Sequence, residues 1–293
     1  MQDDSITIVG CGYVGKRLAK LLQRDGREVF GLVQSQNSQR ALAADGIPAA
    51  TIDLDRSPGA GPGGDYFVYM VPPPSSGDTD PRIRGWLAAL ERAPRCIVYL
   101  STTAVYGDYG GAIVDERSET HPSGDRGRRR LDAEAALLEY SRRSGASVRI
   151  LRVPGIYGPG RLPISRIADG QPIPIPSATG PGNRIHADDL AGVCLAALLY
   201  TGPEEVFNVG DGEYASMGEY YLRVAKLAGL PTPPQLPLAE LLQTVSPAMR
   251  GFLTESRQVD VSLMLNELGY RPDYADLDSG IAASLSEESA SGR

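Results

Sequence analysis

Three glycines near the start of the chain have the spacing of a phosphate-binding turn. Gly10, Gly12 and Gly15 directly follow the apolar run SITIV and open the helical pattern KRLAKLL. In such a strand–turn–helix the first glycine permits the tight turn, the second lets the backbone approach a pyrophosphate, and the third packs helix on strand. The first N–H groups of the helix then remain free for phosphate oxygens. We therefore predict that these glycines, with Tyr13 and Val14 between them, bind a dinucleotide.

The end of the second predicted strand indicates which dinucleotide fits. An acidic side chain about 20 residues after the glycines would accept a hydrogen bond from the ribose 2′-hydroxyl of NAD. The stretch GLVQSQNSQR offers the neutral Gln34 and Ser35 and the cationic Arg40 instead. These residues suit a 2′-phosphate, so the sequence favours NADP over NAD, although Arg40 fits a solvated helix position equally well. Asp53, after the third strand, is a candidate acceptor for the adenine amino group or a cap of the next turn.

A second cluster that could do chemistry is the run of arginines in GDRGRRRLDAEAALLEYSRR, residues 124–143. Apolar residues recur there at helical spacing, while Arg126, Arg128, Arg129 and Arg130 crowd the first turns. A helix N-terminus already carries partial positive charge, so cations are mildly unfavourable there. Binding of a small anion explains the cluster, and so does a solvated face paired with nearby carboxylates. Because Arg128 and Arg129 must point away from the other two, part of the cluster is expected to be solvated.

The elements that must position these residues alternate along the first half of the chain. Short, mostly apolar strand patterns alternate with helical patterns, which predicts an α/β fold with a Rossmann-type, doubly wound parallel sheet. After residue 153 the chain becomes rich in Pro and Gly, and the alternation returns briefly near residues 187–210. We predict an NAD(P)-binding domain of residues 1–153 and 187–210. A smaller, interleaved C-terminal substrate lobe is predicted from residues 154–186 and 211–293.

Ligands of parallel sheets bind beyond the carboxyl ends of the strands. Residues that follow predicted strands are therefore added to the expected cofactor site: Leu54, Val71, Pro72 and Pro154. The stretch VPPPSSGDTDP, residues 71–81, is stiffened by three prolines and is expected to narrow the nicotinamide side.

The bulk composition limits the classes of partner. The 293 residues carry a net charge of −7, with 42% hydrophobic and 22% charged residues, which argues against a nucleic-acid binder. No apolar run is long enough to cross a membrane. Three well-separated cysteines without CxxC spacing suggest buried thiols in a reducing compartment, so we expect a cytoplasmic protein. With only His121 and His186 and no close ligand spacing, we expect no metal site.

Several later stretches resemble the extended short-chain dehydrogenase/reductases, the NAD-dependent epimerase/dehydratase family. Their order along the chain makes the resemblance specific, and it covers nearly the whole sequence. The matching stretches are STTAVYGD (101–108), VDERSETHP (114–122), RVPGIYGPGR (152–161), RIHADDLA (184–191), VFNVGDGE (206–213) and LGYRPDYADLDSGI (268–281).

This resemblance also implies a catalytic set that the chain lacks in part. Family enzymes use a Ser or Thr with a Tyr and a Lys four residues apart on one helix. Thr102 matches the hydroxyl residue, but Arg126 and Arg130 occupy the tyrosine and lysine positions. A guanidinium does not release a proton near neutral pH. Arg130 can still bind the cofactor ribose or a phosphate, and Tyr106 is a candidate to supply the missing proton, although a scaffold function for it is favoured.

Two functions follow from these observations. One is an atypical NAD(P)-dependent oxidoreductase or epimerase-type enzyme that acts on a small, anionic substrate with non-standard acid–base residues. The other is a non-catalytic NADP(H)-binding redox sensor or regulatory protein. The resemblance also implies a homodimer through residues 81–93 and 126–144.

Overall fold

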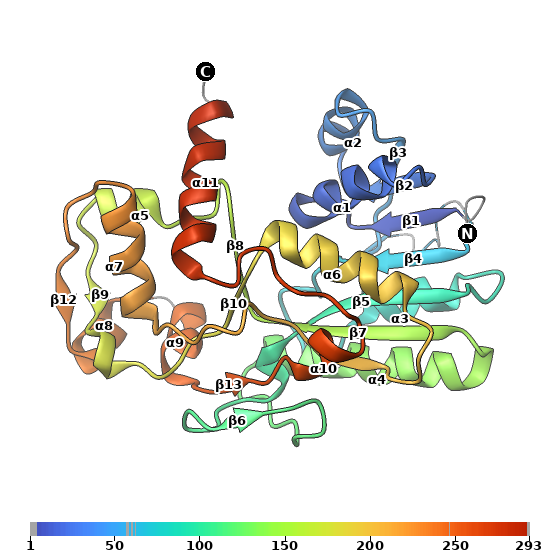
Figure 1. Ribbon diagram of the computed structural model, residues 1–293. Coiled ribbons are helices and arrows are strands. Elements are labelled where there is room, and N and C mark those ends of the chain that lie inside the picture. Colours follow the sequence, from blue (N-terminus) through green and yellow to red (C-terminus); the bar gives the residue numbers. More distant parts are fainter. Residues whose placement is uncertain (1–4, 57–58, 60, 62, 246, 292–293) are drawn as a thin grey trace.

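A seven-stranded sheet lies at the centre of the protein in the computed structural model, which describes residues 5–56, 59, 61, 63–245 and 247–291 (Figure 1). Its strand order is β11-β7-β5-β4-β1-β2-β3, and every neighbouring pair is parallel. The predicted parallel α/β sheet is thereby confirmed. The strands are β1 (Ile6–Val9), β2 (Val29–Val33), β3 (Ala49–Thr51), β4 (Tyr66–Tyr69), β5 (Cys96–Thr102), β7 (Ser147–Val153) and β11 (Val206–Asn208).

Helices cover both faces of this sheet. The helices are α1 (Tyr13–Arg24), α2 (Gln36–Ala44), α3 (Pro81–Ala88), α4 (Asp125–Ser144) and α6 (Ala187–Leu199). On one face, Leu18 of α1 and Leu190 of α6 belong to one buried apolar cluster. On the other face, Trp86 of α3 and Leu137 of α4 belong to a second cluster. The sheet is therefore doubly wound, as the alternation predicts.

A smaller lobe is built on short elements around its own apolar cluster, which includes Ile173, Tyr221 and Ile281. Two pairs of short parallel strands, β10 with β8 and β12 with β9, lie in this part of the chain. The lobe elements are β8 (Gly155–Tyr157), α5 (Ile164–Ala168), β9 (Ile173–Pro174), a 3₁₀ turn (Pro176–Ala178), β10 (Arg184–His186), α7 (Met217–Leu227), β12 (Gln235–Leu236), α8 (Leu238–Thr244), α9 (Pro247–Thr254) and α11 (Leu277–Ser291).

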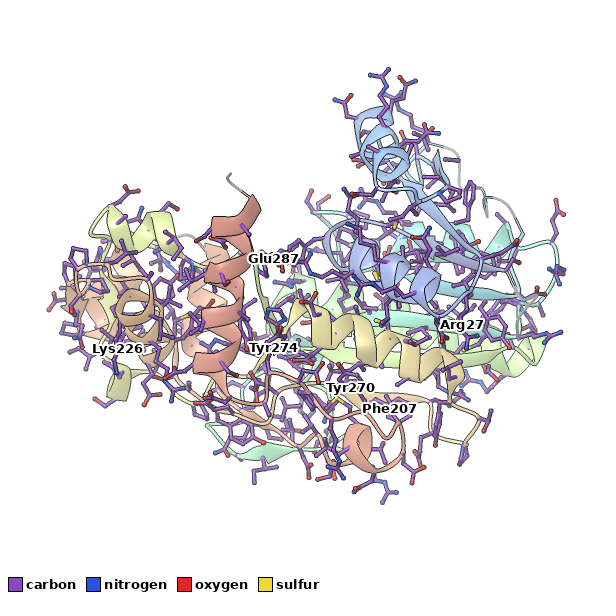
Figure 2. All side chains as sticks on the ribbon, turned by 45° about the horizontal axis from the view of Figure 1, so that its top comes forward. Arg27, Phe207, Lys226, Tyr270, Tyr274 and Glu287 are labelled. Atoms are coloured by element: carbon purple, nitrogen blue, oxygen red, sulfur yellow. The ribbon has the colours of Figure 1, made fainter. Side chains whose placement is uncertain are left out.

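The two parts of the molecule are tied together along α1 and α11. Figure 2 shows Glu287 on α11 at the side that faces the sheet domain. Its carboxylate lies 3.6 Å from the guanidinium of Arg17 on α1, which also pairs with Asp188 at 2.8 Å. The lobe is thus held against the helix that carries the glycine turn.

One segment of the predicted lobe packs on the sheet domain instead. β13 (Gln258–Val259) pairs with β6 (Ile113–Val114), and α10 (Ser262–Asn266) follows it. Val259 and Met264 belong to the same buried cluster as the strands of the main sheet. The predicted ranges of the sheet domain and the lobe stay a prediction, because β13 and α10 fall in the range predicted for the lobe but pack on the sheet domain.

The surface of the described residues bears on two further expectations. Within these residues, no helix combines the length and the apolar character that a membrane crossing requires. The helices α3 and α4, expected at a dimer interface, pack against each other on one face of the sheet, and the homodimer itself stays a prediction.

Candidate functional site

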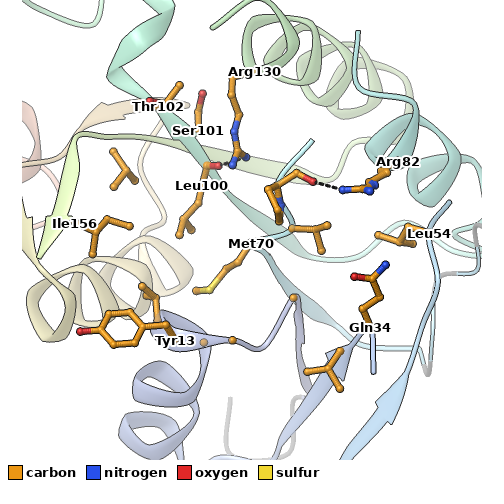
Figure 3. Close-up of a pocket in the computed structure, with 18 of the residues that line it drawn as sticks. Tyr13, Gln34, Leu54, Met70, Arg82, Leu100, Ser101, Thr102, Arg130 and Ile156 are labelled. Atoms are coloured by element: carbon orange, nitrogen blue, oxygen red, sulfur yellow. Dashed lines mark hydrogen bonds between the residues drawn. The ribbon is translucent and has the colours of Figure 1, made fainter. Parts of the chain in front are cut away.

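A cavity of about 350 Å³ opens beyond the carboxyl ends of the central strands (Figure 3). In the sheet, β1 is flanked by β2 and β4, so the strand order reverses there. Such a switch point is where doubly wound sheets bind their ligands. The cavity collects residues at or just beyond the carboxyl ends of β1, β2, β3, β4, β5 and β7, which lie far apart in the sequence.

The glycine turn forms the floor at one end of the cavity. Gly10, Gly12, Tyr13, Val14 and Gly15 all line it. Gly10 has φ +85°, and a Cβ there would lie 2.9 Å from the backbone N of Val71. A Cβ on Gly15 would lie 3.2 Å from Ile8 on β1. Gly12 differs: apart from its two chain neighbours, only the carbonyl oxygen of Gly10 lies within 4 Å of a Cβ there, at 3.9 Å, so the missing side chain leaves open space for a ligand.

The polar end of β2 reaches the cavity only in part. Gln34 lines it, with an exposed side chain. The hydroxyl of Ser35 instead accepts a hydrogen bond from the backbone N–H of Ser38 and caps α2. Arg40 is exposed on α2 and does not line the cavity. Helix capping accounts for Ser35 and solvation for Arg40, so the cavity lining does not support their predicted contact with the cofactor, which stays a prediction.

Predicted residues from the other strand ends lie in the cavity, with one exception. Leu54, Val71, Pro72 and Pro154 line it. Asp53 does not: its carboxylate accepts from the backbone N–H of Asp55 at 3.1 Å, which is the turn cap that the sequence left open. The hydrogen bond favours the turn cap of the two alternatives, and the adenine contact stays a prediction.

Asp55 and Arg82 were missed by the sequence analysis and line this same region. Arg82 donates to both carboxylate oxygens of Asp55, at 2.6 and 2.7 Å, and to the carbonyl of Pro72 at 2.9 Å. These hydrogen bonds lower the pKa of Asp55. The two residues belong to different elements, 27 positions apart, so no local spacing reveals the pair.

Thr102, the last residue of β5, lies at the opposite end of the cavity. Its Oγ1 accepts from the backbone N–H of Ala104 at 3.3 Å. A hydroxyl that accepts in this way still has its proton to donate. Thr102 is therefore placed to donate a hydrogen bond to an oxygen of a bound molecule.

The four arginines in the first turns of α4 differ in their environments. Arg126 and Arg130 both line the cavity. Figure 3 shows Arg130 near Thr102. Arg128 is exposed and pairs with Asp125. Arg129 is 7% exposed and donates to the carbonyl of Gly77 in the proline-rich stretch. The solvated part of the cluster therefore includes Arg128 but not Arg129, which the proline-rich stretch covers.

Arg130 and Arg126 differ in how firmly they are held. Arg130 donates to the carbonyl of Leu100 at 2.6 Å and to the hydroxyl of Tyr99 at 3.0 Å. Arg126 is exposed as a residue, and desolvation of its guanidinium, with the charges of Arg130 and Arg129, lowers its pKa. An arginine remains charged at neutral pH despite such a shift. The two side chains place positive charge beside Thr102, at the end of the cavity away from the glycine turn, which is called the chemical end below.

Tyr106 does not reach the cavity. Its side chain is fully buried, and its hydroxyl donates to Oδ1 of Asn208 at 2.7 Å and accepts from Arg152 at 3.0 Å. Burial raises the pKa of Tyr106 to about 12. Arg152 in turn pairs with the buried Glu134 at 2.8 Å. These contacts give Tyr106 the scaffold function that the sequence favours for it and keep its hydroxyl away from the cavity, so the structure does not support Tyr106 as the proton donor.

The lining residues limit the chemistry that the cavity can perform. Among those that the structure describes, none is Lys, His, Cys or Glu, and the one carboxylate, Asp55, is held by Arg82. The hydroxyl of Tyr13 donates to the carbonyl of Pro159 at 2.7 Å, and that of Ser101 donates to Glu134. With four arginines against one carboxylate, the lining is cationic although the chain is acidic. The cavity is thus suited to an anionic ligand.

Comparisons with known proteins agree with this geometry. Residues 85–210 match the model of the NAD dependent epimerase/dehydratase family. The protein YeeZ of Escherichia coli K12 is 29% identical, over 92% of this chain and 96% of its own. A structure of a functionally unknown conserved protein from Silicibacter pomeroyi has a TM-score of 0.81 and 29% identity, and covers 97% of this chain and 99% of its own. The UDP-glucuronic acid 4-epimerase from Bacillus cereus, in complex with NAD, shares the fold at a TM-score of 0.77, with 19% identity over 98% of this chain and 99% of its own.

Proposed function

We propose that the chain is an atypical enzyme of the NAD-dependent epimerase/dehydratase family, whose model matches residues 85–210. In this proposal it is an oxidoreductase or epimerase-type enzyme that acts on a small anionic substrate. The observation that carries the proposal is the single cavity that joins the glycine turn to Thr102 and Arg126.

The glycine end of the cavity fits a nicotinamide dinucleotide. A Cβ on Gly12 would meet only the carbonyl oxygen of Gly10 within 4 Å, so the space there is open to a ligand, and the first N–H groups of α1 have no partners within the helix. When bound there, the cofactor supplies or accepts a hydride. Gly10, Gly12 and Gly15 would hold its pyrophosphate, and Arg130 would face its ribose.

Thr102 and Arg126 would act on the substrate in this proposal. Thr102 donates a hydrogen bond to the reacting oxygen, and Arg126 binds a carboxylate or phosphate of the substrate with two N–H donors. Both positive side chains at this end also stabilise negative charge that develops on the oxygen. The proton itself comes from water, because neither arginine can release one near neutral pH.

We further propose that NADP is preferred over NAD. Gln34 is neutral and lies in the cavity at the end of β2. The nearby Asp55 is neutralised by Arg82, so its repulsion of a 2′-phosphate is reduced. Arg40, which is exposed on α2 and does not line the cavity, is not needed for this preference.

Calorimetric titration of the purified protein with NADPH and with NADH tests the proposal directly. Micromolar binding of NADPH and weaker binding of NADH is the expected result. A screen of small keto acids and other anionic carbonyl compounds, followed by the absorbance of the reduced cofactor, then looks for turnover. Failure to bind either cofactor would overturn the proposal.

A specific observation favours a second candidate, the non-catalytic sensor. The described lining contains no side chain that exchanges protons near neutral pH. A sensor would bind the dinucleotide tightly, show no turnover in the same screen, and change a partner's affinity between the oxidised and reduced cofactor.

A further inference from the structure

Arg161 crosses from the lobe onto the glycine turn, and the structure assigns it a function there. We propose that Arg161 closes over the diphosphate of the bound dinucleotide, with the ring of Tyr13 as its platform. The inference rests on the proposed function, because it names a residue that binds the same cofactor. The glycine spacing does not include Arg161, and the resemblance places it at the end of the stretch RVPGIYGPGR without giving it a function.

Tyr13 lies between two arginines of different origin. The guanidinium carbon of Arg161 is 4.2 Å from the centroid of the Tyr13 ring, and that of Arg17 is 4.1 Å from it. Two guanidinium groups at these distances cannot share one face of a ring, so they lie on opposite faces. Arg161 lines the cavity, whereas Arg17 does not and is held by Asp188 and Glu287. Arg161 is therefore on the cavity side of the ring.

The loop that carries Arg161 is anchored to the same tyrosine. The hydroxyl of Tyr13 donates to the carbonyl of Pro159 at 2.7 Å. A Cβ on Gly158 would lie only 2.7 Å from that hydroxyl, so the close approach requires a glycine. Residues 158–161 are thus held on the first residue of α1, beside the free N–H groups that follow the turn.

Arg161 differs from Arg82 and Arg130 because its N–H donors are not used by the described part of the protein. Arg82 donates to Asp55 and Pro72, and Arg130 donates to Leu100 and Tyr99. Within the described residues, Arg161 is exposed and makes no side-chain hydrogen bond or ion pair. A guanidinium stacked on a ring keeps its five N–H donors in its own plane, in the fork that suits phosphate oxygens.

These features point to a diphosphate as the ligand. The turn and α1 offer backbone donors on one side, and Arg161 offers charged donors on the other. An arginine from the lobe that contacts a cofactor on the sheet domain also joins the two parts of the molecule. Cofactor binding is then expected to slow hydrogen exchange at residues 158–163.

The test compares Arg161→Ala with Arg271→Ala, a matched change at an exposed arginine that does not line the cavity. Calorimetry at low salt measures NADPH, ADP-ribose and adenosine. We expect Arg161→Ala to weaken NADPH and ADP-ribose by about ten- to a hundredfold and to leave adenosine unchanged, because adenosine has no diphosphate. The loss should shrink at high salt, since Arg161 is exposed. Arg161→Lys, which keeps the charge and loses the fork, should restore only part of the affinity.

The outcomes separate this inference from the proposed function. If the unaltered protein binds NADPH and Arg161→Ala binds it equally well, the inference is wrong and the proposed function stands. If the unaltered protein binds neither NADPH nor ADP-ribose, both fail. If Arg161→Ala weakens only UDP-glucose, measured with saturating cofactor, Arg161 contacts a substrate diphosphate and the inference is wrong. Equal loss for adenosine and a lowered Tm would also contradict it, since they indicate damage to the fold.

Discussion

The two ends of the cavity offer a ligand different kinds of contact, one from the backbone and one from side chains. At the glycine end, the contacts offered to a ligand are backbone N–H groups and the space left by Gly12. At the α4 end, they are the side chains of Thr102, Arg126 and Arg130. Backbone geometry at the first end leaves few alternatives to glycine, whereas the side chains at the second end can change without altering the fold. The binding end therefore matches the family pattern, and the chemical end departs from it.

The largest effect that can break this comparison is expected from Gly12→Ala. The new methyl group would enter open cavity space rather than the protein, because only one described atom lies within 4 Å of its position. It would occupy the position of the approaching pyrophosphate, so binding of NADPH should weaken by at least about a hundredfold, with a small change in Tm. Calorimetry and thermal unfolding of the same preparation measure both quantities.

Gly10→Ala is the matched control for that prediction. Its φ of +85° and the 2.9 Å approach to Val71 make the substitution costly for the fold itself. It should lower Tm as well as binding. If Gly12→Ala lowered Tm as much as Gly10→Ala, the space beside Gly12 would not be open to a ligand as proposed.

A smaller effect is expected at the other end of the cavity, from Arg126→Ala. Loss of a two-donor contact to a substrate anion should reduce kcat/KM by about ten- to a hundredfold once a substrate is found. The Kd of NADPH should stay the same, because Arg126 lies at the chemical end. Arg128→Ala is the control, since Arg128 is exposed and pairs with Asp125. Unchanged kinetics for Arg126→Ala would exclude it from substrate binding.

The same contrast explains what could be predicted from the sequence. The parallel sheet and the glycine turn follow from short-range patterns, apolar strands and a fixed glycine spacing, which act within one element or two adjacent ones. All five predicted residues of the turn line the cavity. Asp55, Arg82 and Arg161 could not be found in this way, because their placement depends on contacts between elements distant in the chain.

Polar residues at strand ends were the least predictable. Ser35, Asp53 and Gln34 all follow strands, but a side chain there can cap the next helix or turn instead of facing a ligand. Only the fold decides between the two. The arginines of α4 show the same limit, since helical spacing places Arg129 on the outer face, and the proline-rich stretch that covers it cannot be inferred from periodicity.

A further, roughly tenfold effect would sharpen the comparison within the binding end. Gln34→Asp places a carboxylate at the end of β2, where it would repel a 2′-phosphate and accept from a 2′-hydroxyl. Binding of NADPH should weaken and binding of NADH should improve, so that the preference reverses. Arg40→Ala serves as the control and should leave both affinities unchanged. If Gln34→Asp altered neither cofactor, the proposed position of the ribose would be wrong.

The smallest effect on activity is expected from Tyr106→Phe. This substitution tests whether Tyr106 stabilises the fold around the cavity without taking part in the reaction. The hydroxyl of Tyr106 links Asn208 to Arg152, and both partners are buried. Its removal should lower the free energy of unfolding by about 1–3 kcal/mol, because buried polar groups lose a partner. Turnover and cofactor affinity should remain within about twofold, since no atom of Tyr106 lines the cavity. Urea unfolding and steady-state rates on one preparation separate the two expectations. A loss of turnover without a loss of stability would indicate that Tyr106 takes part in the reaction. The chemical end would then include a tyrosine hydroxyl, and the comparison of the two ends would be wrong in that respect.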